Sequence, residues 1–178
     1  MAIDWKALGQ QVGDLNADGT ERNAGSTDSA RRALELIIGE HNIREAVDHW
    51  TTLEPGAYTA EKTLLIISST VAMEYCYEIY KNEPNTQRAG LAIFLLSEMA
   101  DSRFMRWARE LMDDVRTRWN TVVALEQVLE GPLGDKGIAL AKELLAEAET
   151  DPDQRLRERA VEIHKRLASN PRLGHLGL

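Results

Sequence analysis

The sequence predicts an all-α protein, a short right-handed α-solenoid of stacked antiparallel helical hairpins with no β-sheet. Apolar residues recur at helical spacing in successive short segments that are separated by Pro, Gly and Asp. Two consecutive blocks, 104–129 and 138–167, each have the pattern of a helix, an acidic break and a second helix. The sequence ARELM at 108–112 in the first block is similar to AKELL at 141–145 in the second. Because one helix pair cannot bury its apolar stripe alone, echoing pairs favour a stack.

The length and composition favour one globular domain covering residues 1–178. Apolar residues make up 43% and charged residues 28% of the chain, which is typical of a folded protein. We expect an N-terminal helix and loop over 1–26, a helical-hairpin stack over 27–168 and a tail over 169–178.

The first segment, 3–12, predicts a helix that places Trp5, Leu8 and Val12 on one packed stripe. The glycine- and asparagine-rich segment 13–26 reads as a loop. Its DLNADG stretch is similar to the start of a calcium loop, but it lacks the regular acidic ligands and the glutamate at the twelfth position. The sequence therefore predicts no bound calcium.

Two short helices follow, and each has a distinct boundary signal. The first ends at Gly39, and Asn42 with Glu45 has the spacing of a capping box that begins the second. The long apolar stretch after Pro55-Gly56 divides at Ser68-Ser69-Thr70, which predicts helices over about 58–67 and 70–81. The helix over 70–81 is apolar on two sides, as expected of a central helix or of one that presents a binding face.

Helix starts in the remaining chain are predicted from acidic and hydroxyl residues. Thr86 or Asn85, Asp101 or Ser102, Asp113-Asp114 and Asp151 precede helical stripes. The side chains expected to point inward are Leu95, Leu96, Met99, Phe104, Trp107, Ala108, Leu111, Val115, Trp119, Val122, Leu125, Leu129, Leu144, Leu145, Leu156, Ala160, Ile163 and Leu167.

Residues 86–168 resemble HEAT repeats. The Val115-Arg116 pair entering a second helix and the Asp-Pro-x-x-x-Leu-Arg pattern from Asp151 to Arg157 carry this resemblance. The longer pattern, AMEYCYEIYK followed by RWNTVVALEQVL and LRERAVEIHKRL, looks like small acidic HEAT-type immunity partners of bacterial toxins. That resemblance implies direct binding and neutralisation of a toxin domain, and it implies no particular contact residues.

The charge of the chain argues against nucleic acid as a partner. The formal charge is −8 and the isoelectric point is about 5.1, whereas phosphate backbones are bound mainly by basic residues. Residues 1–87 carry −7 and 88–155 carry −4, and only 156–178 is basic, at +3. We therefore expect a neutral or basic protein partner.

The cellular setting is predicted from what the chain contains. Cys76 is the single cysteine, so no intrachain disulfide can form and a reducing cytoplasm is the simplest compartment. The N-terminus does not have the pattern of a signal peptide. The longest apolar run, LLII at 64–67, is far too short to span a membrane.

Two groups of residues are candidate partner contacts. Glu74, Tyr75 and Glu78 lie on the helix over 70–81, where tyrosines offer rigid amphipathic contact area. Asp113 and Asp114 mark an acidic edge at a predicted helix start. The simpler interpretation, which we favour for the tyrosine-rich helix taken alone, is that its tyrosines are core and its glutamates are solvated.

No catalytic, cofactor or metal site is predicted. His41, Glu45 and His49 share a helix face, but a ladder along one helix cannot surround one zinc ion with all three residues. Cys76 is expected to be a buried, unreactive thiol, and Trp119-Asn120 to serve packing. GPLGDKG at 131–137 lacks the strand and the ending of a phosphate loop.

The leading hypothesis is a cytoplasmic protein-binding module that is not an enzyme. Its alternatives are a helical-repeat enzyme or ligand-binding protein of the nucleic-acid repair or tetrapyrrole-attachment type, and a scaffold subunit. A deep polar pocket holding Glu74 and Glu78 would favour the enzyme.

Overall fold

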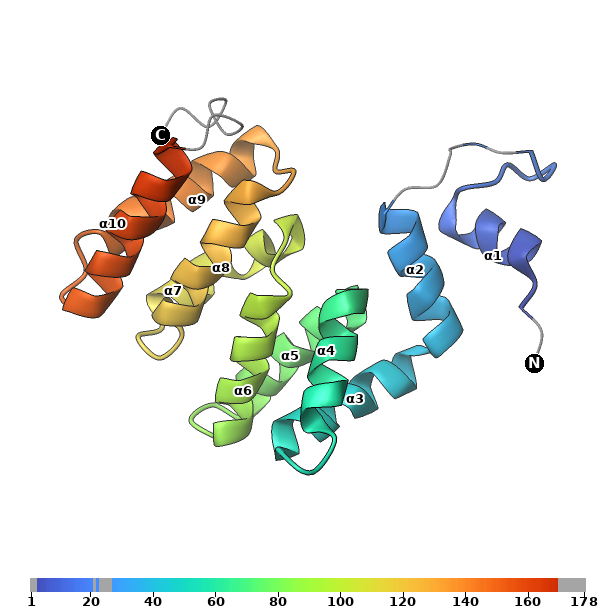
Figure 1. Ribbon diagram of the computed structural model, residues 1–178, viewed down its shortest axis with the longest axis horizontal. Coiled ribbons are helices and arrows are strands. Elements are labelled where there is room, and N and C mark those ends of the chain that lie inside the picture. Colours follow the sequence, from blue (N-terminus) through green and yellow to red (C-terminus); the bar gives the residue numbers. More distant parts are fainter. Residues whose placement is uncertain (1–2, 21, 23–26, 170–178) are drawn as a thin grey trace. The chain divides into compact units, whose positions relative to one another are not determined.

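The computed structural model describes residues 3–20, 22 and 27–169, and within them every regular element is a helix (Figure 1). The prediction of an all-α fold is confirmed. The chain divides into two compact units, Met1–Pro84 and Asn85–Leu178, called here the N-terminal and C-terminal units. A continuous solenoid over residues 27–168 stays a prediction.

The N-terminal unit is built around α3, which packs against both α4 and α5. Its core is formed by the inward stripes of these three helices, because Ile43, Val47 and Met73 are almost completely shielded from solvent. The helices are α1 (Trp5–Val12), α2 (Thr27–Ile38), α3 (Glu40–Thr52), α4 (Ala57–Ile67) and α5 (Thr70–Asn82).

The predicted break between α4 and α5 is present. Ser68 adopts a left-handed conformation with φ of 44°, and this ends α4. Ser69 then caps α5, since its hydroxyl accepts a hydrogen bond from the N–H of Ala72 at 3.3 Å. Two consecutive serines therefore turn one apolar stretch into two helices.

The start of α3 differs from the prediction. The helix begins at Glu40, immediately after Gly39, whose φ of 84° reverses the chain. Asn42 lies inside the helix, and its side-chain amide donates to the carbonyl of Ile38 at 2.6 Å. The capping-box prediction was therefore wrong, because a glycine between two helices sets the boundary before Asn42 is reached.

The N-terminal helix is less buried than its apolar stripe suggested. α1 contacts α2, and Val12 is buried. Trp5, however, is 66% exposed. The prediction of a packed stripe holds at the C-terminal end of α1 and fails at its first residue.

The C-terminal unit is organised around α8, which contacts α6, α7, α9 and α10 (Figure 1). α8 buries side chains on several sides, including Val122, Leu125 and Leu129 as predicted. A helix surrounded in this way must be apolar around most of its circumference. The elements are α6 (Gln87–Glu98), the 3₁₀ helix η1 (Ser102–Arg106), α7 (Ala108–Asp113), α8 (Arg118–Glu130), α9 (Asp135–Ala148) and α10 (Gln154–Ser169).

The start of α8 also corrects the prediction. The helix begins at Arg118 rather than at Asp113-Asp114, because the Asp114 carboxylate bonds the N–H and guanidinium of Arg116 and so fixes a turn. Val115 and Trp119, both predicted to point inward, are 75% and 43% exposed. The helical spacing of apolar residues in the sequence therefore runs on through a segment that the structure forms as a turn, which the side chain of Asp114 stabilises.

A partly buried ion pair joins α8 to the turn between α9 and α10. Arg118 Nη1 lies 2.8 Å from the Asp151 carboxylate, and Arg118 Nε donates to the carbonyl of Met112 at 2.9 Å. Asp151 therefore holds this turn against α8, and the α10 cap is Asp153, which accepts from the N–H of Arg155 at 2.8 Å. The predicted cap at Asp151 was two residues too early.

Replacing Arg118 with Ala is expected to lower the free energy of unfolding by about 1–3 kcal/mol, since it leaves the buried Asp151 carboxylate without its cation. Arg116→Ala is the matched control, because Arg116 is 42% exposed and its main partner is two residues away. Its cost should stay below about 1 kcal/mol. Urea unfolding followed by circular dichroism measures both changes, and equal losses would contradict the role assigned to Arg118.

Candidate functional site

The excess of acidic residues is confined almost entirely to the N-terminal unit. Residues 1–84 contain fourteen acidic and seven basic residues, a formal charge of −7, whereas residues 85–178 contain fifteen and fourteen, a charge of −1. An electrostatic contact with a basic partner is therefore best supported by surfaces of the N-terminal unit.

One cluster on this unit combines aromatic and ionic side chains from two helices. Glu40, Arg44 and Asp48 recur at every fourth residue of α3, and Arg44 and Asp48 contact Tyr75 and Glu78 of α5. We call these five residues the α3–α5 cluster. The packing of α5 against α3 positions them, so the cluster is part of the folded framework.

Arg44 is the centre of the α3–α5 cluster. Its Nη1 lies 2.8 Å from Glu78 Oε2, and its Nε lies 2.8 Å from Glu40 Oε1. The hydrogen bond to Glu78 is the main cause that raises the pKa of Arg44 above its ordinary value. Glu78 is therefore paired within the fold, whereas the sequence suggested a solvated acid.

Tyr75 is held on both its face and its hydroxyl. The guanidinium carbon of Arg44 lies 4.6 Å from the ring centroid, and the hydroxyl donates to Asp48 Oδ1 at 2.9 Å. These contacts fix the orientation of a half-buried ring. A side chain that is already ordered loses less conformational entropy when it binds a partner.

The other residues of α5 divide between surface and core. Glu74 is exposed, next to Tyr75 in the chain. Tyr80 is buried, and Tyr77 is half-buried with its ring centroid 6.2 Å from that of Tyr80. The helix thus has both a buried side and an exposed, polar side.

Asp113 and Asp114 lie in the other unit and differ in role. Asp114 fixes the turn before α8. Asp113 is exposed and lies 3.8 Å from Arg109, which also pairs with Glu143 and Glu147 at 2.6 Å each. Glu147 is the main cause that raises the pKa of Arg109. Asp113 is therefore the more accessible acid, at the edge of an ion-pair network.

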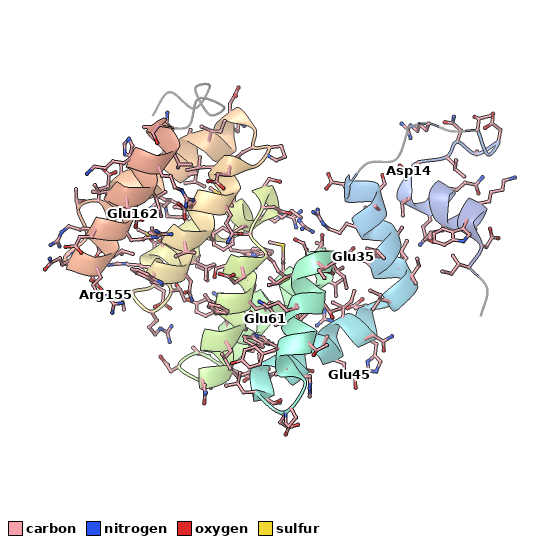
Figure 2. All side chains as sticks on the ribbon, viewed as in Figure 1. Asp14, Glu35, Glu45, Glu61, Arg155 and Glu162 are labelled. Carbon is pink, nitrogen blue, oxygen red and sulfur yellow. The ribbon has the colours of Figure 1, made fainter. Side chains whose placement is uncertain are left out.

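Sequence reasoning missed a second surface near the start of α8. Val115 and Trp119 are exposed there. The guanidinium carbon of Arg155 on α10, the residue labelled in Figure 2, lies 5.6 Å from the Trp119 ring centroid. Exposed Trp and Arg are typical of protein contacts. Only the Asp114 turn chemistry in the sequence signals that the helical stripe is interrupted here.

The open hollows lined by described residues include the following two. One of about 460 Å³ lies between α3 and α4, where Glu45, Asp48 and His49 contribute to its lining. The other, of about 470 Å³, lies beside α10, where Glu162 contributes (Figure 2). Glu74 and Glu78 do not contribute to the lining of these two hollows.

Arg44 and Asp48 were also missed as site residues. Their contacts with Tyr75 join positions 31 and 27 residues apart in the chain, so no local pattern reveals them. The i, i+4 spacing of Glu40, Arg44 and Asp48 was the available signal, since it places one cation between two acids on a single helix face.

The histidines of α3 show no metal-like arrangement in the described residues. His49 Nε2 lies 3.2 Å from the carbonyl of Pro55, which orients its ring toward the end of the helix. Within residues 3–20, 22 and 27–169, no group of three or more His, Cys, Asp or Glu is placed to hold a metal ion.

Comparison of the chain with protein-family models, curated proteins and solved structures finds no match. The resemblance to HEAT-type immunity proteins therefore stays a prediction. No helix in the described part of the chain is both long and apolar enough to cross a membrane.

Cys76 is completely buried in α5, and this burial raises the pKa of its thiol well above the usual range. We expect the folded protein to react with a thiol-specific reagent at least about 100-fold more slowly than the protein in urea, since the thiolate is the reactive form. A colorimetric thiol assay measures both rates. Rapid reaction of the folded protein would show that α5 opens readily.

The Arg44–Glu78 pair should make a small, salt-sensitive contribution to stability. The two side chains are 34% and 47% exposed, so a double-mutant cycle with Arg44→Met and Glu78→Gln should give a coupling of about 0.2–1 kcal/mol. The coupling should fall in 1 M salt because of screening. Urea unfolding measures it, and a coupling of zero in low salt would contradict the pairing.

Proposed function

We propose that this chain is a protein-binding immunity module that neutralises a cognate bacterial toxin in the cytoplasm by direct binding. The observation that carries the proposal is the α3–α5 cluster, in which Tyr75 is held between the Arg44 guanidinium and the Asp48 carboxylate, in a unit of formal charge −7. The resemblance of the chain to acidic HEAT-type immunity proteins supports the same conclusion.

The charge indicates the kind of partner. A toxin domain that acts on nucleic acid or another anionic substrate needs a basic active-site surface. An acidic protein attracts such a surface over the screening length and so speeds the encounter. Binding there would cover the toxin's active site, and inhibition would require no chemistry from this chain.

The contact surface follows from exposure around Tyr75. Glu40 and Glu78 have 63% and 47% of their side chains exposed, and Glu74 is exposed on the same helix as Glu78. These carboxylates would bind lysine and arginine side chains of the toxin, while the Tyr75 ring supplies apolar area. Asp113 is a second candidate contact, and Asp114 is retained mainly for its turn.

Co-expression tests the proposal directly. Each gene neighbouring this one is expressed alone and together with this chain, and we expect one product to be toxic alone, harmless together and purified in a stoichiometric complex. If no neighbouring product is toxic or bound, the immunity proposal fails. A stable complex with a harmless product would retain protein binding and would identify a scaffold.

Tyr75→Ala should weaken the binding of that toxin at least about tenfold, because it removes the ordered aromatic at the centre of the contact. The matched control is Tyr58→Ala on α4, since Tyr58 is 72% exposed and belongs to the same unit but lies outside the α3–α5 cluster. Calorimetric titration measures both affinities. Equal effects would place the contact elsewhere.

A further inference from the structure

The second helix of the N-terminal unit carries an apolar stripe that the unit does not bury. Ala30, Leu34 and Ile37 lie on one face of α2, at spacings of four and three residues. Ala30 is exposed, and Leu34 and Ile37 are each 41% exposed. Within residues 28–38, no apolar side chain of α2 is buried. We call Ala30, Leu34 and Ile37 the α2 stripe.

A contact with α5 fixes the rotation of α2 about its own axis. Glu35 Oε1 accepts a hydrogen bond from the N–H of Thr70, at the start of α5 (Figure 2). Because successive helical residues are rotated by about 100°, directing Glu35 toward α5 turns Leu34 and Ile37 to other sides of the helix. The exposure of the α2 stripe therefore follows from the way α2 is attached to the unit.

The last described helix, α10, has the opposite distribution of side chains. α10 buries Leu156, Ile163 and Leu167. Its exposed residues include the charged Glu162 and Lys165. A helix at the end of a stack needs such a polar outer face to stay soluble. Since α2 instead exposes its apolar face, we expect another protein surface to cover it.

α1 adds further exposed apolar side chains to the helix pair that it forms with α2 (Figure 1). Trp5, the first residue of α1, is 66% exposed, and Ile3 is 42% exposed. Trp is among the residue types that contribute most to protein–protein contacts. The apolar surface of the first two helices is therefore larger than the α2 stripe alone.

The charge of these two helices favours a second copy of this chain as the partner. Residues 3–12 and 27–38 contain three acidic and three basic residues, which sum to zero. Residues 39–84 contain eight acidic and three basic residues, a formal charge of −5. A basic partner is attracted to the second of these regions, whereas another copy, with its charge of −8, is repelled least at the first. Within α2, moreover, Arg31 already pairs with Asp28 at 3.0 Å.

We propose that the α2 stripe is a homodimer contact, in which α2 of one copy packs against α2 of a second copy. A twofold axis places the same patch on both copies, so the patch must be complementary to itself. An apolar stripe on a helix of zero net charge meets this condition, because no excess of like charge faces itself across the axis. Leu34 and Ile37 of each copy would form the centre of the contact. The proposal does not depend on the toxin-binding proposal.

The short stripe and the charge of the chain set the expected strength of the dimer. The contact belongs at the low end of interface sizes, below about 1,200 Å², so we expect a reversible dimer with a dissociation constant on the order of 10⁻⁵ M. Two copies of charge −8 repel each other. Raising the salt from about 0.05 M to about 1 M should therefore lower the dissociation constant at least about threefold. A contact with a basic partner would weaken under the same change.

Sedimentation equilibrium of the full chain tests the contact. Leu34→Glu should weaken the dimer at least about tenfold, because it places a carboxylate in each half of the apolar contact. The matched control is Leu53→Glu, since Leu53 is 47% exposed and follows α3 in the same unit, outside the α2 stripe. Its dissociation constant should stay within about twofold of the wild type. Far-UV circular dichroism checks that both variants keep their helices.

Cross-linking gives a second measurement that preserves an uncharged side chain in the stripe. Cys76 is completely buried, so Leu34→Cys and Leu53→Cys each add one exposed thiol. A short bis-maleimide should join two copies of Leu34→Cys into a covalent dimer and should leave Leu53→Cys mainly monomeric.

Three outcomes would overturn the proposal. The first is a chain that stays monomeric up to about 0.5 mM, and the second is equal weakening of the dimer by Leu34→Glu and Leu53→Glu. The third is a Leu34→Glu variant that still dimerises as the wild type does but no longer binds the toxin, which would show that the toxin covers the α2 stripe. The first two outcomes concern the purified chain alone, so they leave the toxin-binding proposal untouched.

Discussion

A carboxylate that is buried away from water needs a compensating positive charge nearby. This requirement determines which ion pairs form in both units of the protein. In the C-terminal unit, Arg118 meets it by joining the start of α8 to Asp151 in the turn between α9 and α10. Arg159 and Arg166 meet it for Glu126, which α8 carries into its contact with α10. The central helix α8 thus contacts its neighbours through apolar packing and through ion pairs. These ion pairs can form only when the helices are packed as they are here.

The balance of acidic and basic residues differs between the two units, and this difference supports the surface proposed for partner binding. In the C-terminal unit acids and bases almost balance, and many of the acids contact arginines of neighbouring helices. In the N-terminal unit, seven basic residues face fourteen acidic ones, so pairing within the unit cannot neutralise its surface. Arg44 illustrates the limit, because one guanidinium serves both Glu40 and Glu78. The N-terminal unit therefore keeps a formal charge of −7, which the proposed binding of a basic partner would use.

Helical periodicity predicted most helices, and its failures have local causes. The stripe Val122, Leu125 and Leu129 is buried as predicted, since only core packing decides those positions. Val115 and Trp119 fit the same period and are exposed, because Asp114 bonds its own backbone and ends the helical register. Of the candidate site, α5 was identified from its composition, whereas Arg44 was missed because its contact with Tyr75 exists only after α3 and α5 pack.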